Sequence, residues 1–168
     1  MDVDAAKVLG GLGAFLAAIG FFAGWPASVV GVVLLYVALA ELRIGVGEDR
    51  SKWLVYAIAA LVAFGIAQAI LGFSLERLRT WWELPARGLA LAVGLAAWVA
   101  GWVLQVASAY RLRPILAALQ SRIGESLFSI ANTLYWWGSA LAVVAIGLII
   151  VAVAYILMGV GLIVAKTQ

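Results

Sequence analysis

Charged residues are confined to a few short segments of this chain, and long apolar runs separate them. Residues 8–40 and 126–165 contain no charged side chain over 33 and 40 positions, and residues 53–74 and 88–110 form two shorter runs of the same kind. A charged side chain at the centre of a bilayer costs about 2.5–3.5 kcal/mol on insertion scales. The pattern therefore predicts an all-α fold, a polytopic transmembrane helical bundle.

Two of the runs are too long for one membrane crossing. A single helix over residues 8–40 would be about 50 Å long, whereas the hydrocarbon core is roughly 30 Å thick. Pro26 disfavours helical geometry at the preceding residue, so we expect a turn there between two short helices, nearly perpendicular to the bilayer or in locally thinned bilayer. In the C-terminal run Gly147 is the best candidate for a break, on length alone.

These turns predict about six helices in three hairpin-like pairs, forming one integral membrane domain over residues 1–168. Two connections have the composition of short interfacial helices between spans: residues 75–84, and a segment from Pro114 with apolar residues on one face. We interpret both as surface anchors, with partner docking as the alternative. The predicted spans lie near residues 5–23, 27–43, 52–74, 87–111, 123–145 and 148–165.

The basic residues indicate an orientation. With a cytoplasmic N-terminus, eight lysines and arginines fall on the inner side and three on the outer side, as the positive-inside rule requires. We therefore predict a multi-pass protein of the cell membrane with both termini cytoplasmic. The net charge of +3 does not indicate a nucleic-acid partner, because the basic residues lie beside apolar runs instead of forming one patch.

Composition narrows the chemistry further. Hydrophobic residues make up 67% of the chain, charged residues only 11%, and there is neither cysteine nor histidine. Disulfides, thiolate chemistry, imidazole haem ligation and the commonest zinc sites are thereby removed. No nucleophile and base pair can be assembled from the remaining residues. We predict that the protein is not an enzyme and has no catalytic residues, no cofactor and no metal site.

Few polar side chains fall inside the predicted spans, and none of those is ionisable. The largest are Gln68, Gln105 and Asn132. In one interpretation they line a polar pocket or pore. In the other they form hydrogen bonds between helices, each contributing roughly 1 kcal/mol or less.

Small residues recur at every fourth position in two of the predicted helices. This spacing lets helix backbones approach closely in lipid, but it does not say whether the partner helix belongs to this chain or to a neighbouring subunit. The two strips are Ala6, Gly10, Ala14 and Ala18 in the first helix, and Ala92, Ala96 and Ala100 in the fourth.

Eight tryptophans are many for a chain of 168 residues. Half of them fall at predicted interfaces, where tryptophan is enriched. The others lie deeper, where internal packing and a lipid-binding role are the alternatives. The interfacial set is Trp25, Trp53, Trp81 and Trp82, and the deep set is Trp98, Trp102, Trp136 and Trp137.

The first and last predicted hairpins share a faint repeat. Residues 13–18 followed by 30–35 are similar to residues 138–143 followed by 146–151. The two hairpins would have the same orientation in the membrane, so a rotation about the membrane normal would relate them. Duplication and chance similarity between apolar segments are both open at this point.

Three segments carry a resemblance to a known family: Ala-Ala-Lys-Val-Leu-Gly-Gly-Leu-Gly-Ala, Val-Gly-Val-Val-Leu-Leu-Tyr-Val-Ala-Leu-Ala-Glu-Leu and Ala-Ile-Gly-Leu-Ile-Ile-Val-Ala-Val-Ala-Tyr-Ile-Leu. Together they resemble a family of small archaeal multispanning membrane proteins of unknown function. The resemblance covers most of the chain and implies an archaeal plasma-membrane origin. It supplies no catalytic or binding residue.

Our first functional hypothesis is a non-enzymatic integral membrane protein with a structural or assembly role. It would act as a homo-oligomer or as a subunit of a larger membrane complex, packing through its small-residue faces and binding membrane lipids. The alternative is a passive channel or small-solute transporter with a pocket made by Gln68, Gln105 and Asn132. A third hypothesis is a lipid-organising protein that uses the deep aromatic residues.

Overall fold

The computed structural model describes residues 2–76 and 84–165, and the side chains of residues 2–72 and 88–165. In these residues the chain forms α-helices, a short 3₁₀ turn and no strand. The elements are α1 (Val3–Ala23), α2 (Trp25–Glu41), α3 (Gly47–Glu76), α4 (Leu84–Ile123), α5 (Leu127–Leu141), the 3₁₀ turn η2 (Ala142–Val144) and α6 (Ile146–Val164). The all-α prediction is confirmed.

Five helical segments are long and apolar enough to cross a membrane, and α2 is a shorter apolar helix. The predicted turn near Pro26 is present, because α1 ends at Ala23 and Pro26 lies in the first turn of α2. Gly24 between them has a φ of 134°, which favours glycine. Residues 77–83, with the predicted interfacial tryptophans Trp81 and Trp82, lie outside the described residues.

The C-terminal apolar run is two helices, as predicted, but the break is not at Gly147. It lies at η2 and at Ala145, whose φ is 59°. Gly147 belongs to α6 and faces α5. A Cβ atom at Gly147 would lie 2.2 Å from the backbone nitrogen of Ala142, so this glycine permits close packing of two helices instead of ending one.

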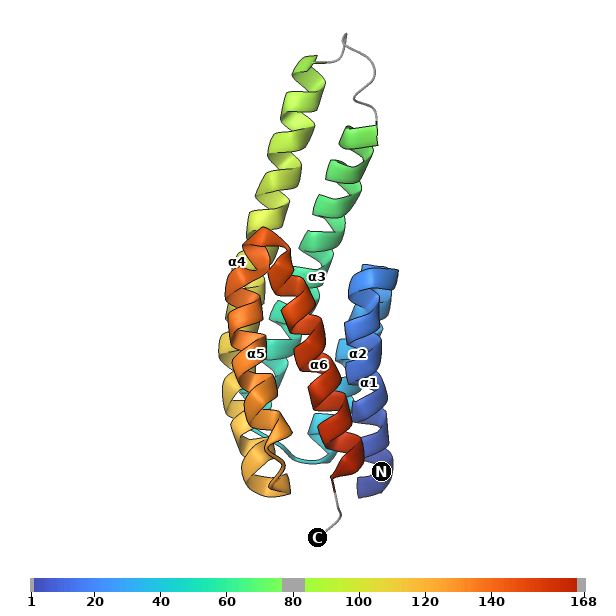
Figure 1. Cartoon of the computed structure of the whole chain (residues 1–168), viewed down its shortest axis with the longest axis vertical. Helices are drawn as coiled ribbons and strands as arrows, with labels where there is room; N and C mark the ends of the chain where they lie inside the picture. Colours follow the sequence, from blue (N-terminus) through green and yellow to red (C-terminus); the bar gives the residue numbers. More distant parts are fainter. Residues whose placement is uncertain (1, 77–83, 166–168) are drawn as a thin grey trace.

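The α1–α2 and α5–α6 hairpins share the same close crossing. A Cβ atom at Gly13 would lie 2.7 Å from Leu35 N, and one at Gly138 would lie 2.8 Å from Val151 N. These residues are at matching positions of the sequence repeat. Both hairpins also run in the same direction in the bundle (Figure 1). The repeat therefore corresponds to a shared packing geometry.

Helix α4 is 40 residues long and continues through Pro114. The separate interfacial helix predicted to start at Pro114 is not formed, because the helix that contains the predicted span continues to Ile123. Proline inside a helix costs about 3 kcal/mol. Here Leu112, Ile115, Leu116 and Leu119 are all buried on one face, and each buried side chain of this size contributes about 1.5–3 kcal/mol. Burial of this face outweighs the cost of the proline.

The helices do not all end at the same level. At one end of the bundle, which we call the terminal end, α1 begins and α6 ends. Lys7 Nζ there donates a hydrogen bond of 3.1 Å to the carbonyl oxygen of Ala165. At the other end, the α3–α4 end, α3 and α4 extend well past the turns of both hairpins (Figure 1). The bundle thus has six helices over part of its length and only two over the rest.

Candidate functional site

A buried polar network joins α4, α5 and α6. Gln105 Nε2 donates hydrogen bonds to Tyr135 Oη at 3.2 Å and to Ser139 Oγ at 3.3 Å. Tyr135 Oη also lies 3.2 Å from Ser108 Oγ and 3.2 Å from Tyr155 Oη. All five side chains are buried. Hydrogen bonds link these side chains across three helices, so Gln105 acts as an interhelical contact instead of facing an open cavity.

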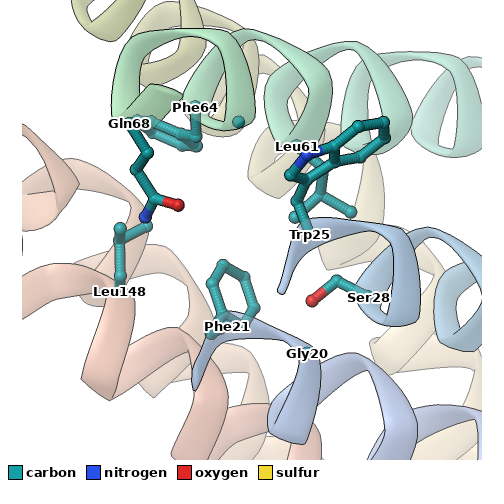
Figure 2. A pocket seen from close by; sticks show the side chains of 9 residues that line it. Gly20, Phe21, Trp25, Ser28, Leu61, Phe64, Gln68 and Leu148 are labelled. Carbon is teal, nitrogen blue, oxygen red and sulfur yellow. The ribbon is translucent and has the colours of Figure 1, made fainter. Parts of the chain in front are cut away.

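Gln68 lies elsewhere, at a small cavity between the turns of the two hairpins. Its side chain comes from α3 and points towards Leu148 of α6, and Ser28 and Phe21 lie on the opposite wall (Figure 2). Ser28 Oγ donates to the carbonyl oxygen of Ala17 at 2.9 Å. The cavity volume of about 20 Å³ is the room of about one water molecule.

The three polar residues of the channel hypothesis are not brought together. Gln105 belongs to the buried network, and the cavity at Gln68 is lined by neither Gln105 nor Asn132. Asn132 is half-buried on α5. Of the three, Gln105 alone forms hydrogen bonds between helices, so the interhelical interpretation is supported for this residue.

The deep tryptophans of α4 have a defined role that sequence analysis did not identify. Trp98 Nε1 donates to the carbonyl oxygen of Val143 at 3.0 Å, and Trp102 Nε1 donates to that of Ala140 at 3.1 Å. Both acceptors lie where α5 ends and the chain turns towards α6, among carbonyl groups without partners within their helix. The indole groups therefore cap this turn from a neighbouring helix.

The remaining described tryptophans differ in their surroundings. Trp53, predicted at a membrane interface, follows Lys52 near the start of α3 and is fully buried there by the bundle. Trp25 is partly exposed and packs on Gly65 of α3. The guanidinium group of Arg113 lies 5.3 Å from the ring centre of Trp136, and Trp137 is exposed. Three of these four tryptophans therefore contact other parts of the chain: Trp25, Trp53 and Trp136.

The two small-residue strips have opposite surroundings. Ala6, Gly10, Ala14 and Ala18 of α1 are all buried inside the chain. At Gly10 a Cβ atom would lie 2.9 Å from both Ala38 Cβ and Leu162 Cδ1. This strip therefore packs against α2 and α6. The strip of α4 is exposed along its whole length: Ala92, Ala96 and Ala100, with Gly88 one step before them.

Charged side chains gather at the terminal end. Arg111 Nη1 forms an ion pair of 3.1 Å with Asp49 Oδ1, and Lys52 pairs with Glu48. Arg122 Nη1 donates to the carbonyl oxygen of Leu42 at 2.8 Å. Within residues 2–76 and 84–165, no three acidic side chains are grouped so as to hold a metal ion.

Comparison with known proteins places the chain in a family. Residues 27–156 match the family described as a protein of unknown function, DUF996. The chain belongs to the DUF996 family. It is also 27% identical, over 159 residues, to an uncharacterized protein of the archaeon Methanocaldococcus jannaschii, an alignment that covers 94% of this chain and 89% of that protein. No solved structure matches the chain.

The part that matches DUF996 includes α2 to α5 and most of α6. It therefore contains the polar network and the capping tryptophans, whereas α1 precedes it. The family is one of unknown function, and an archaeal relative agrees with the resemblance seen in the sequence. The five long apolar helices of this family member indicate a multi-pass membrane protein.

Proposed function

We propose that this member of the DUF996 family is a non-enzymatic integral membrane protein with a structural or assembly role. It acts as a homo-oligomer or as a subunit of a larger membrane complex, in contact with membrane lipids. The observation that carries the proposal is the exposed small-residue strip of α4. Contacts within the chain bury the whole strip of α1, whereas no helix of the described residues lies against the strip of α4.

The strip faces away from the rest of the chain. Gly94 and Gly101, on the other side of α4, pack against Leu71 and Phe64 of α3. Residues four positions apart share one face of a helix, so Ala92, Ala96 and Ala100 form a continuous surface. In lipid, helices associate through close packing of such surfaces, because the hydrophobic effect gives no preference for protein over hydrocarbon. The strip is thus suited to a second α4 or to a helix of another subunit.

The polar groups of the bundle support a structural role over a catalytic one. Hydrogen bonds link Gln105 to its four partners within the bundle. The described ion pairs lie at the terminal end. A transport or proton-transfer site in a membrane usually requires an ionisable group inside the spans. We place the protein in the cell membrane, with both termini on the cytoplasmic side according to the charge distribution.

Disulfide cross-linking tests the proposal, because the chain has no cysteine of its own. Ala96→Cys and Ala100→Cys are introduced singly, with Val153→Cys on the exposed face of α6 as the matched control. We expect oxidation of native membranes to produce a cross-linked homodimer, or a covalent adduct with another subunit, at Ala96 and Ala100 only. No more cross-linking at these positions than at Val153, with a monomer mass in native mass spectrometry, would contradict the proposal.

The alternative function, a passive channel or small-solute transporter, has less support. It requires Gln68, Gln105 and Asn132 to face one wet pathway. Gln105 is buried in its own network, and the cavity at Gln68 has room for about one water molecule. Solute flux into liposomes that is abolished by Asn132→Leu would favour this alternative.

A further inference from the structure

The turns of both hairpins are apolar and exposed. At the α5–α6 turn, Val144 is 62% exposed, and Val143 and Ile146 are also exposed. At the α1–α2 turn, Phe22 is 72% exposed, and Trp25 lies beside it. Turns that face water usually carry glycine, proline, asparagine, aspartate or serine. The α5–α6 turn has none of these residues, and the α1–α2 turn, which contains Gly24 and Pro26, also presents large apolar side chains at its end.

Part of the backbone of the α5–α6 turn is hydrogen-bonded from within the protein. Trp98 and Trp102 cap the carbonyl oxygens of Val143 and Ala140 from α4. Within the turn, Ala145 N donates to Ala142 O at 3.2 Å. In hydrocarbon each unsatisfied backbone group costs several kcal/mol, so irregular backbone needs partners supplied by the protein. The indole groups of Trp98 and Trp102 supply such partners to two carbonyl groups at this turn.

The contacts with α3 and α4 give the depth of the turns. Gly65, which packs on Trp25, lies 12 residues after Trp53, where the charge-free run of α3 begins. Trp98 lies 12 residues before Tyr110, where the charge-free run of α4 ends. At 1.5 Å per residue, the points where α3 and α4 meet the turns lie about 18 Å from the ends of their charge-free runs at the terminal end. The two runs continue for about another 14–15 Å beyond them.

We infer that α1–α2 and α5–α6 are half-membrane hairpins. They enter the bilayer from the terminal end, turn near its mid-depth, and are covered by the hydrocarbon chains of lipids from the other leaflet. These chains also contact exposed leucines of α4 past the turns, such as Leu91 and Leu95. The inference requires neither the oligomer proposed above nor a particular orientation of the termini.

This arrangement makes the protein a wedge. In this arrangement the six described helices occupy the leaflet at the terminal end, and of these α3 and α4 alone continue into the other leaflet. Figure 1 shows these two helices extending past the turns of both hairpins. The larger cross-section in one leaflet means that lipids of the other leaflet fill the space above the two turns. Lipid is the occupant to expect because most of the side chains exposed at the turns are large and apolar, with Gln68 of α3 as the polar exception. Two carbonyl groups beneath this surface accept hydrogen bonds from tryptophans of α4.

Spin-label accessibility tests the inference on the whole protein in liposomes. A nitroxide is attached at Val144→Cys, with Ile146→Cys as a second exposed site of the same turn. Ser121→Cys at the terminal end and Gly88→Cys near the start of α4, both exposed, serve as controls. Collision rates with oxygen, which concentrates in hydrocarbon, and with a water-soluble nickel chelate are measured at each site.

For the labels at Val144 and Ile146 we expect a high rate with oxygen and a low rate with nickel, and a depth about 15 Å greater than at Gly88. Nickel accessibility equal to that at Gly88 or Ser121 would place the turn in water and overturn the inference. Low accessibility to both reagents would show that protein, such as a second copy, covers the turn, and would also overturn it. Loss of cross-linking at Ala96 would leave these expectations unchanged.

Discussion

Replacement of Gly31 by alanine tests the close helix crossing on which both hairpins depend. A Cβ atom at position 31 would lie 2.2 Å from Ala17 N, 2.6 Å from Gly13 O and 2.7 Å from Ala17 Cα. All three are backbone atoms of α1, so no change of rotamer relieves the contact. The two helices must separate by about 1 Å or more to restore ordinary packing distances.

The size of the effect follows from comparison with a second glycine. Overpacking of this kind costs about 1–3 kcal/mol, whereas alanine in a helix is favoured over glycine by about 1 kcal/mol. Gly72 of α3 is a matched control, because a Cβ atom there would meet nothing within 4 Å. Both substitutions share the helix-propensity gain, so Gly31→Ala should be less stable than Gly72→Ala by about 1–3 kcal/mol.

The free energy of unfolding of the parent chain and of each variant is measured by unfolding in mixed micelles with increasing SDS. Far-ultraviolet circular dichroism follows the loss of helix. We expect Gly72→Ala to be slightly more stable than the parent chain and Gly31→Ala to be the least stable. Gly147→Ala should behave like Gly31→Ala, because its Cβ would lie 2.2 Å from Ala142 N. A Gly31→Ala protein as stable as Gly72→Ala would refute the crossing geometry.

Three further predictions use the same unfolding measurement. Trp98→Phe should cost about 1–3 kcal/mol because the carbonyl group of Val143 loses its donor, whereas Trp137→Phe at an exposed position should change the free energy of unfolding by no more than about 0.5 kcal/mol. Gln105→Leu should cost about 0.6–2 kcal/mol because Tyr135 and Ser139 lose a donor; an effect no larger than that of Asn132→Leu would contradict the role of the network. Asp49→Asn should cost no more than about 1 kcal/mol, and less in 1 M salt, because its ion pair with Arg111 is about one-third exposed.

The sequence was sufficient to predict six helices and the approximate positions of the two hairpin turns. Hydrocarbon thickness limits a helical crossing, so the apolar runs of 33 and 40 residues had to be divided. Proline then located the first turn within a few residues. The second turn was displaced from Gly147 because glycine both breaks helices and permits close packing. Only the position of α5 against Gly147 distinguishes the two roles.

Contacts between distant segments could not be predicted from spacing alone. The strips of α1 and α4 have the same period, yet one is buried by α2 and α6 and the other is exposed. Trp53 and Trp25 were both predicted to lie at a membrane interface, yet Trp53 is fully buried in the bundle and Trp25 is partly exposed. Pro114 predicted a helix boundary, but the buried face that continues past it outweighs the local preference. In each case tertiary packing decides between outcomes that the local sequence permits.

The depth of a segment in the membrane depends on where it contacts the other helices, and the hydropathy of that segment alone does not determine it. The charge-free part of α1 covers 16 residues, about 24 Å, which is short for a crossing and led to the expectation of a perpendicular helix or a thinned bilayer. The contact of Trp25 with Gly65 gives a different reason for this length, because it places the turn only part of the way along α3. A hairpin that ends there needs no thinning of the bilayer. The apolar turn of this hairpin and the tryptophan caps of the second hairpin then have the same cause. At this depth, polar backbone groups need hydrogen-bond partners from the protein, and side chains that face lipid need to be apolar.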